Sequence, residues 1–150
     1  MDKLYLHPDF ADFLECLQKF QVDFLIVGAF ALAKLGYPRG TGDIDIWIKP
    51  EKENAQNALK GISEFGMASL NLSIEDILSG DVIQMGFPPI RIDLMSKLTG
   101  VSTEEIWASR QEGKLEKFNV FFLSKEVFIK NKKAIGRHKD LADIESLMDE

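Results

Sequence analysis

Three aspartates are the residues of this sequence best suited to chemistry, and two of them stand close together. Asp43 and Asp45 lie in the stretch Asp43–Lys49, where acidic and apolar residues alternate. Alternation with a period of two predicts a strand, so both carboxylates leave the same face of it. Like charges side by side raise each other's cost of ionisation, and a bound cation removes that cost. Carboxylate oxygens suit Mg²⁺, although an edge strand with a simply polar outer face would show the same pattern.

Asp93 is the third acid, and it stands alone in the apolar run Ile90–Met95. A strand over this run places Arg91 and Asp93 on one face. If the run lies beside the strand that holds Asp43, three carboxylates converge, and such a set can hold two metal ions about 3.5–4 Å apart. The competing interpretation is that Arg91 and Asp93 form an ion pair at the surface.

A glycine precedes these acids at the end of another apolar run. Val22–Val27 predicts a buried strand, Gly28 ends it, and Ala29–Leu35 predicts a short helix. Glycine at such a turn lets backbone N–H groups approach an anion at the beginning of the helix. A single glycine also fits any tight turn from strand to helix, so it does not by itself indicate a phosphate site.

The remaining patterns supply the elements that must position these residues. Helices and strands alternate, so the fold class is α/β or α+β, with a small mixed central sheet flanked by helices in a single domain over residues 1–150. Trp47 falls on the acid face of its strand, where it either lines the site or packs beneath a covering element. The further helices are expected over 8–20, 50–65, 73–78, 125–135 and 139–148, with a short one opened by Ser102 and Glu105, and the further strands over 82–86 and 119–123.

Charge and composition limit the possible partners. The net charge of −6 argues against a non-specific nucleic-acid binder, yet the segment 125–139 carries six cations against one acid. That basic segment is either a phosphate contact or a solvated helix face. No stretch approaches the roughly 18 apolar residues of a membrane span, and no signal peptide is apparent. With Cys16 as the only cysteine, we expect a cytoplasmic protein without an internal disulfide.

Taken together, these motifs resemble the signature of the polymerase-beta-like nucleotidyltransferase superfamily. The resemblance rests on Val27–Leu32 with its Gly28-Ala29 turn, on Gly36, Arg39 and Thr41, and on Asp43-Ile44-Asp45. It is nearest to the minimal nucleotidyltransferases and to the toxin-like nucleotidyltransferases of bacterial toxin–antitoxin systems, whose tail is similar to Gly136–Glu145. The resemblance runs from about Val22 to Glu145, and it covers the middle of the chain only loosely.

The resemblance implies a role for each matching residue. Asp43, Asp45 and Asp93 would bind two Mg²⁺ ions, with Asp93 as a further candidate for the general base. Gly28 and Ala29 would contact the phosphates of a nucleoside triphosphate such as ATP, and Arg39 and Thr41 would support the loop or touch the nucleotide. Lys139, with Arg137 and Lys130, would neutralise phosphate. From their spacing of three on the last helix, we expect Asp140 and Asp143 to orient Lys139 and cap that helix rather than to bind metal.

Two functions of different classes remain open. The first is transfer of a nucleoside monophosphate to a hydroxyl of an RNA 3′ end, a protein or a small molecule. The second is a catalytically weak, nucleotide-binding regulatory partner in a two-protein system, because Ala29 stands where the family turn usually has serine or glycine. A metal-dependent phosphodiesterase ranks lower, since His7 and His138 are the only histidines.

Overall fold

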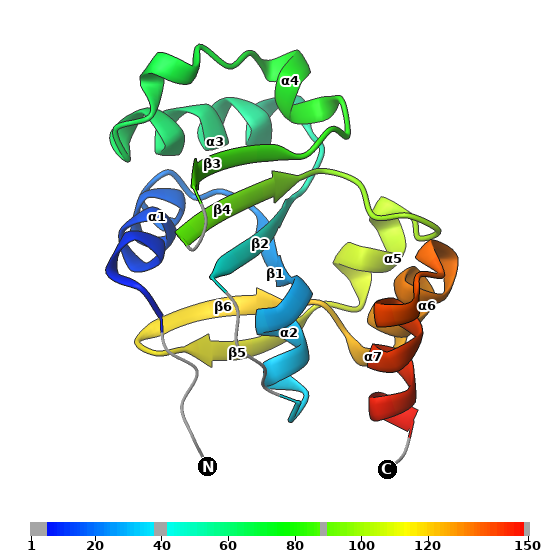
Figure 1. Ribbon diagram of the computed structural model, residues 1–150. Coiled ribbons are helices and arrows are strands. Elements are labelled where there is room, and N and C mark those ends of the chain that lie inside the picture. Colours follow the sequence, from blue (N-terminus) through cyan, green and yellow to red (C-terminus); the bar gives the residue numbers. More distant parts are fainter. Residues whose placement is uncertain (1–5, 38–41, 88–89, 149–150) are drawn as a thin grey trace.

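A mixed six-stranded sheet forms the centre of the molecule (Figure 1). The computed structural model describes residues 6–37, 42–87 and 90–148. The strands follow the order β3-β4-β2-β1-β6-β5, in which β4 pairs with β2 and β6 pairs with β1 in parallel, and the other neighbours are antiparallel. The strands are β1 (Phe24–Val27), β2 (Asp43–Ile48), β3 (Ile83–Phe87), β4 (Ile90–Met95), β5 (Gln111–Leu115) and β6 (Phe118–Phe122).

Helices cover the sheet in two groups. Figure 1 shows α1, α3 and α4 on one side of the molecule and α5, α6 and α7 on the other, with α2 following directly on β1. This arrangement confirms the mixed sheet flanked by helices that the sequence predicts. The helices are α1 (Pro8–Lys19), α2 (Gly28–Lys34), α3 (Lys52–Glu64), the 3₁₀ turn η1 (Ala68–Leu70), α4 (Ile74–Leu78), α5 (Thr103–Ala108), α6 (Lys125–Ile135) and α7 (His138–Met148).

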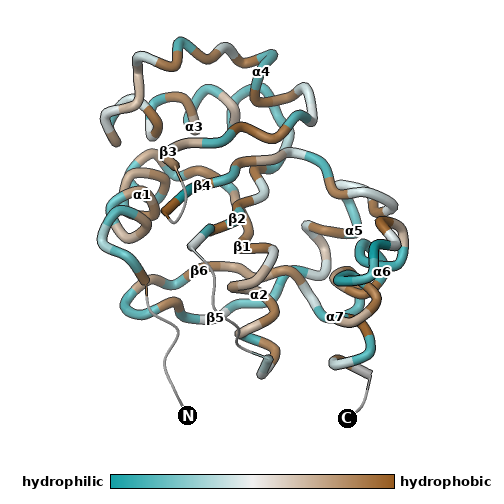
Figure 2. The backbone as a smooth tube through the Cα atoms, viewed as in Figure 1, coloured by the Kyte–Doolittle hydropathy of each residue, from teal (hydrophilic) through white to brown (hydrophobic). Residues whose placement is uncertain are grey.

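The core is built from the faces that the periodicities assign to it. On β2, Ile44, Ile46 and Ile48 are buried, and on α1 the apolar stripe of Phe10, Phe13, Leu14 and Leu17 is buried against the sheet side. Figure 2 shows the hydrophobic strand β1 at the centre of the molecule. None of the described helices has the length and apolar character that crossing a lipid bilayer requires.

Trp47 lies inside this core rather than at the site. It is fully buried, and its ring lies 6.4 Å from the ring of Trp107 on α5. The Arg110 guanidinium lies over the Trp107 ring, with its Cζ 3.9 Å from the ring centroid. Of the two roles open to Trp47, the structure therefore gives packing beneath a covering element.

A buried asparagine fixes the strands that lead to the site. Asn54, on α3, accepts a hydrogen bond from the Asp23 N–H at 2.7 Å, and its amide donates to the carbonyls of Asp23 and Lys49 at 2.9 Å each. Asp23 immediately precedes β1, and Lys49 immediately follows β2. Three hydrogen bonds from one buried side chain thus set where the two antiparallel strands lie relative to each other.

Strand β5 and the turn η1 are the elements that the sequence did not predict. Of the β5 residues only Leu115 is buried, so this edge strand lacks the alternation that reveals a half-buried strand. It pairs with β6 in an antiparallel hairpin whose turn holds Glu116 at a positive φ of 53°. The capping boxes at Ser73 of α4 and at Ser102 of α5 are present, and the latter confirms the predicted helix start.

Candidate active site

The three aspartates gather because their strands are neighbours. Strands β2 and β4 run parallel, and their register places Asp45 opposite Asp93 and Asp43 opposite Arg91. Paired residues of neighbouring strands point to the same face, so all four side chains lie on one face of the sheet. The condition on which the convergence of the acids depended is therefore met.

Arg91 lies among these acids instead of forming a separate surface pair. Its Nε donates to Oδ1 of Asp93 at 2.8 Å, and its Nη2 donates to Oδ2 of Asp93 at 3.0 Å and to Oδ2 of Asp43 at 2.9 Å. The acids thus converge, and Arg91 pairs with two of them within the site and not with Asp93 alone at the surface.

Asp45 is the acid with the strongest electrostatic perturbation. Burial first, and then the negative charges of Asp93 and Asp43, raise the pKa of Asp45 to about 6, although Lys132 opposes the shift. Among the described residues, no cation forms an ion pair with Asp45. A carboxylate in this setting gains free energy from any cation that reaches it.

Gly28 begins α2 directly against this carboxylate. Its φ is +65°, and a Cβ built on it would lie 2.9 Å from Cγ of Asp45 and overlap the Oδ2 oxygen. Only glycine meets both the backbone conformation and the close approach. The turn and the carboxylates therefore belong to one unit, although β1 and β2 lie apart in the sequence.

A cavity of about 650 Å³ opens over the carboxylates. Gly28, Ala29 and the three aspartates line it on one side. Four cations from the loop after β4 and from the α6–α7 region line it as well, namely Lys97, Lys132, Arg137 and Lys139. Its apolar lining includes Val82, Met95, Leu98 and Phe128. Acids and cations around one cavity suit a ligand with several phosphates when a divalent cation accompanies it.

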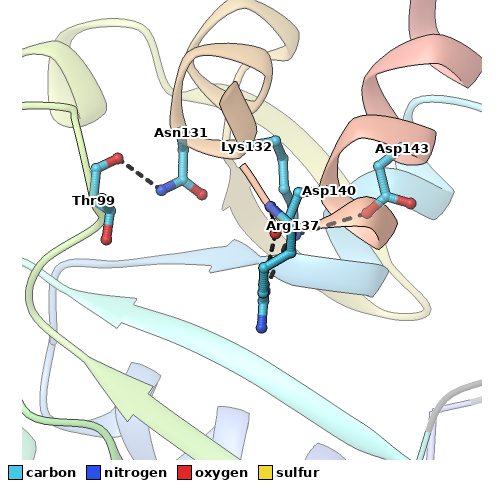
Figure 3. Close-up of polar contacts among 6 residues, drawn as sticks. All are labelled: Thr99, Asn131, Lys132, Arg137, Asp140 and Asp143. Atoms are coloured by element: carbon cyan, nitrogen blue, oxygen red, sulfur yellow. Dashed lines mark hydrogen bonds and ion pairs between the residues drawn. The ribbon is translucent and has the colours of Figure 1, made fainter. Parts of the chain in front are cut away.

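Lys132 is a cavity residue that the sequence motifs did not single out, as are Lys97 and Asn131, the residue before Lys132. Its Nζ lies 3.2 Å from Oδ1 of Asp140 and 3.7 Å from Oδ2 of Asp143, and both acids are buried (Figure 3). Asp140 also accepts from Nε of Arg137 at 2.6 Å, and Arg137 together with Lys132 lowers the pKa of Asp140 to about 2 despite its burial. The two acids were expected to orient Lys139, and the structure instead pairs them with Lys132. The sequence did hold a signal for this contact: Asp140 and Asp143 are three residues apart on α7, and Lys132 lies one turn before the end of α6.

Asn131 ties the loop after β4 to the same helix. Its side-chain amide donates to the Thr99 carbonyl at 2.9 Å, as Figure 3 shows, and Asn131 is itself buried in the cavity wall. The neighbouring Gly100 lies so close to Ala134 that a Cβ would overlap it. The loop that carries Lys97 is thereby fixed to α6.

Lys130 is the expected phosphate ligand that the structure places elsewhere. Its Nζ pairs with the Glu105 carboxylate on α5, and Lys130 is not among the residues that line the cavity. Lys130 precedes Lys132 by two residues on the helix, which corresponds to a rotation of about 200°. The two side chains therefore leave different faces of α6. Lys139 and Arg137 do line the cavity, whereas Arg39 and Thr41 lie outside the described residues.

The donor chemistry of the acids suits Mg²⁺, and the arrangement of their side chains is incomplete for it. Within residues 6–37, 42–87 and 90–148, no group of three or more histidine, cysteine, aspartate or glutamate side chains is arranged to hold a metal ion. Carboxylate oxygens are the hard ligands that Mg²⁺ requires, but Arg91 engages two of the three acids. The residue types fit the metal, and the position of Arg91 stands between them and a complete ligand set.

Comparison with known proteins supports the fold through structure alone. No protein-family model matches the sequence, and a search of curated proteins found no match. Among solved structures, the lincosamide antibiotic adenylyltransferase LnuA with lincomycin bound superposes with a TM-score of 0.56 at 14% identity, covering 95% of this chain and 96% of LnuA. A Thermotoga maritima protein described as a candidate nucleotidyltransferase gives a TM-score of 0.54 at 16% identity, covering 97% and 94% of the two chains. The chain therefore has the polymerase-beta-like nucleotidyltransferase fold.

Proposed function

We propose that this protein is a Mg²⁺-dependent nucleotidyltransferase that moves a nucleoside monophosphate from a triphosphate such as ATP to a hydroxyl acceptor. The observation that carries the proposal is one cavity in which Asp43, Asp45 and Asp93 face the cations of α6 and α7. A triphosphate with its metal ions presents matching charges, negative toward the lysines and positive toward the carboxylates. We take residues 1–150 as one catalytic domain and expect it in the cytoplasm, where such nucleotides are available.

Each group in the cavity has a distinct part in this proposal. The three aspartates hold the divalent cations, which when bound polarise the α-phosphoryl group and neutralise the departing pyrophosphate. The backbone of Gly28 and Ala29 lies beside the phosphates, with Arg39 and Thr41 expected nearby. The remaining phosphate charge falls to the cations of the opposite wall, Lys132, Arg137 and Lys139.

The residues of the chain act mainly by positioning and by charge neutralisation. Lys132 is held by buried acids, so its ammonium group is already oriented before a substrate arrives, and this lowers the cost of reorganisation. Asp93 is the candidate for the carboxylate that accepts the proton of the attacking hydroxyl. Asp45, with its raised pKa, is the acid that gains most from the added positive charge.

Charge and the lining of the cavity bear on the class of the acceptor. The net charge of −6 gives no basic track for a long RNA, though one 3′ end needs only a small basic patch. LnuA is by its name an adenylyltransferase of a lincosamide antibiotic, which makes a small-molecule hydroxyl a reasonable first class to test. The apolar lining at Val82, Leu98 and Phe128 gives such a molecule a surface to pack against.

The test is transfer of label from α-³²P-labelled triphosphates. Wild-type protein, Mg²⁺ and each of the four triphosphates are incubated with short RNAs, a protein extract or a panel of hydroxylated small molecules. We expect label in one acceptor class with the wild type and with Asp81→Ala, a matched exposed aspartate. The double variant Asp43→Ala, Asp45→Ala should transfer nothing, and equal transfer by this variant would refute the mechanism.

A second function is favoured by two particular residues. Ala29 supplies no hydroxyl near the phosphates, and Arg91 already neutralises two of the acids. Both suit a nucleotide-binding regulatory member of a two-protein system of the toxin–antitoxin kind. Calorimetry with ATP and Mg²⁺ separates the two functions: binding without transfer to any acceptor favours the regulatory role, and binding with transfer favours the enzyme.

A further inference from the structure

The Arg91 guanidinium bonds oxygens of Asp43 and Asp93 that a metal ion shared by these two carboxylates would need. Its three hydrogen bonds take both oxygens of Asp93 and one oxygen of Asp43, at 2.8–3.0 Å. The Asp93 side chain is 9% exposed, and that of Arg91 is 24% exposed, so little solvent separates these charges. Two-pronged contacts between arginine and carboxylate are among the stronger hydrogen bonds in proteins.

A divalent ion and this guanidinium compete for the same oxygens. Mg²⁺ binds carboxylate oxygens at about 2.0–2.1 Å in a nearly octahedral shell, which leaves no room for a cation bonded to the same atoms. Two positive groups at that separation also repel each other strongly where solvent is scarce. The ion can join Asp43 and Asp93 only if Arg91 leaves at least one of them.

We infer that Arg91 is a built-in counter-ion of the carboxylates, which a divalent cation must displace before the ligand set is complete. The inference rests on the proposed function, because it concerns the same three acids. Arg91 keeps the carboxylates neutralised and together in the metal-free protein. Once displaced, its long side chain still projects into the cavity, where the guanidinium can meet a phosphate oxygen of the nucleotide.

The strand register explains why this residue can do so. Arg91 lies opposite Asp43 on the neighbouring strand and two residues before Asp93 on its own strand, so one side chain reaches both acids. Lysine offers a single point of charge at this position and lacks the planar fork that engages both oxygens of Asp93. The contact is therefore specific to arginine.

The experiment measures metal affinity directly, without any turnover. Mn²⁺ is titrated calorimetrically into the wild type, Arg91→Met and Lys97→Met, each first checked for folding by thermal melting. We expect Arg91→Met to bind Mn²⁺ about tenfold or more tightly than the wild type, on the scale of one released charge-assisted contact. Lys97→Met removes the same charge from the cavity wall without freeing a carboxylate oxygen, so it should change the affinity by less than about threefold.

A second readout follows Arg91 in the wild-type protein itself. In ¹⁵N-labelled protein, the Nε–H signal that is missing from Arg91→Met is assigned to Arg91, and it should shift as Mg²⁺ is added. An Arg91 signal that is unchanged at saturating Mg²⁺, or equal Mn²⁺ affinities of the wild type and Arg91→Met, would overturn the inference and leave the proposed function standing. Absence of Mn²⁺ binding in every protein would overturn both.

Discussion

The contact between Gly28 and Asp45 joins backbone conformation and site chemistry at one residue. We predict that Gly28→Ala lowers the free energy of unfolding by about 3 kcal/mol or more, because it combines a left-handed backbone with an overlap against the carboxylate. Gly66→Ala is the matched control: its φ is +99°, and no atom lies within 4 Å of the added Cβ. That variant should lose only about 1–2 kcal/mol in urea unfolding.

If the two alanine variants lose the same stability, the close approach of Gly28 to Asp45 contributes nothing beyond the backbone. A crystal structure of Gly28→Ala would then show where the carboxylate has moved. The expected direction is toward Asp93, since β2 lies between the Gly28 turn and the strand that carries Asp93.

Asp45 makes stability depend on pH in a direction unusual for an acid. Its pKa in the folded protein, about 6, lies above the ordinary value of 3.8, so the folded state holds the proton more tightly than the unfolded state does. The stability that the protonated form contributes is complete below pH 3.8 and is lost as the pH rises through about 6. Asp45→Asn lacks this loss, so it should gain on the wild type by roughly 1–3 kcal/mol between pH 4 and pH 8.

Urea unfolding of both proteins at pH 4, 6 and 8 checks this. The comparison uses the difference between variant and wild type at each pH, because groups that are not coupled to Asp45 titrate equally in both. Asp81→Asn, an exposed control, should keep a constant difference from the wild type. A constant difference for Asp45→Asn as well would contradict the expected burial penalty.

For single residues, the sequence predicts the placement of the acidic side chains better than that of the basic ones. Alternation alone places Asp43, Asp45 and Asp93 on strand faces, because a strand's period leaves only two choices for each side chain. The environment of Lys132 arises from two helices and the turn between them, and no local period predicts that packing. Lys130 shows the same limit: its charge is visible in the sequence, but its pairing with Glu105 depends on where α5 packs.

At the scale of elements, α6 and α7 act as one unit that presents Lys132. We predict that Lys132→Met weakens binding of ATP with Mg²⁺ by about 10–100-fold, since it removes an oriented charge from the cavity wall. Lys133→Met, the neighbouring exposed lysine on α6, should bind as the wild type does. Calorimetry at fixed ionic strength makes the comparison, and equal losses in both variants would indicate a general charge effect instead.

The same unit can be tested from its acidic side. Asp140→Asn removes a fully buried carboxylate that holds both Lys132 and Arg137, and we expect a loss of about 3 kcal/mol in stability at pH 7. Circular dichroism during urea unfolding measures it. A loss below about 1 kcal/mol would show that Lys132 is held by other contacts.

Most elements were predictable because their signals are local. Capping residues mark the starts of α4 and α5, and β2 and β4 show the period of a strand. The edge strand β5 was missed because it carries polar residues on both faces, so neither periodicity nor apolar content distinguishes it from a loop. Apart from the antiparallel pair that the adjacent runs 82–86 and 90–95 predict, and that β3 and β4 form, strand order was beyond the sequence, since pairing partners are selected by tertiary packing.

At the scale of the whole molecule, the cavity draws its walls from segments far apart in the chain. A ligand that bridges them has no counterpart in the unfolded state, so it stabilises the folded protein by mass action. With ATP and Mg²⁺ at about 100 times the dissociation constant, we expect about 2.7 kcal/mol of stabilisation and a melting temperature higher by about 5–10 °C. Thermal melting of the wild type beside the Asp43→Ala, Asp45→Ala variant tests this, and equal shifts would place the nucleotide away from the acids.

The parallel pairing of β1 with β6 has a consequence for biosynthesis. Ile26 lies opposite Phe122, and α6 and α7 follow only after β6, so a nascent chain that has left the ribosome as far as β4 carries the aspartates without the opposing lysines. The sheet is completed only when nearly the whole polypeptide is available, because a strand pairing between residues this distant in sequence forms late. A fragment released by early termination of translation therefore has the aspartates of the cavity without the lysines of α6 and α7, and it cannot contact a triphosphate with both groups.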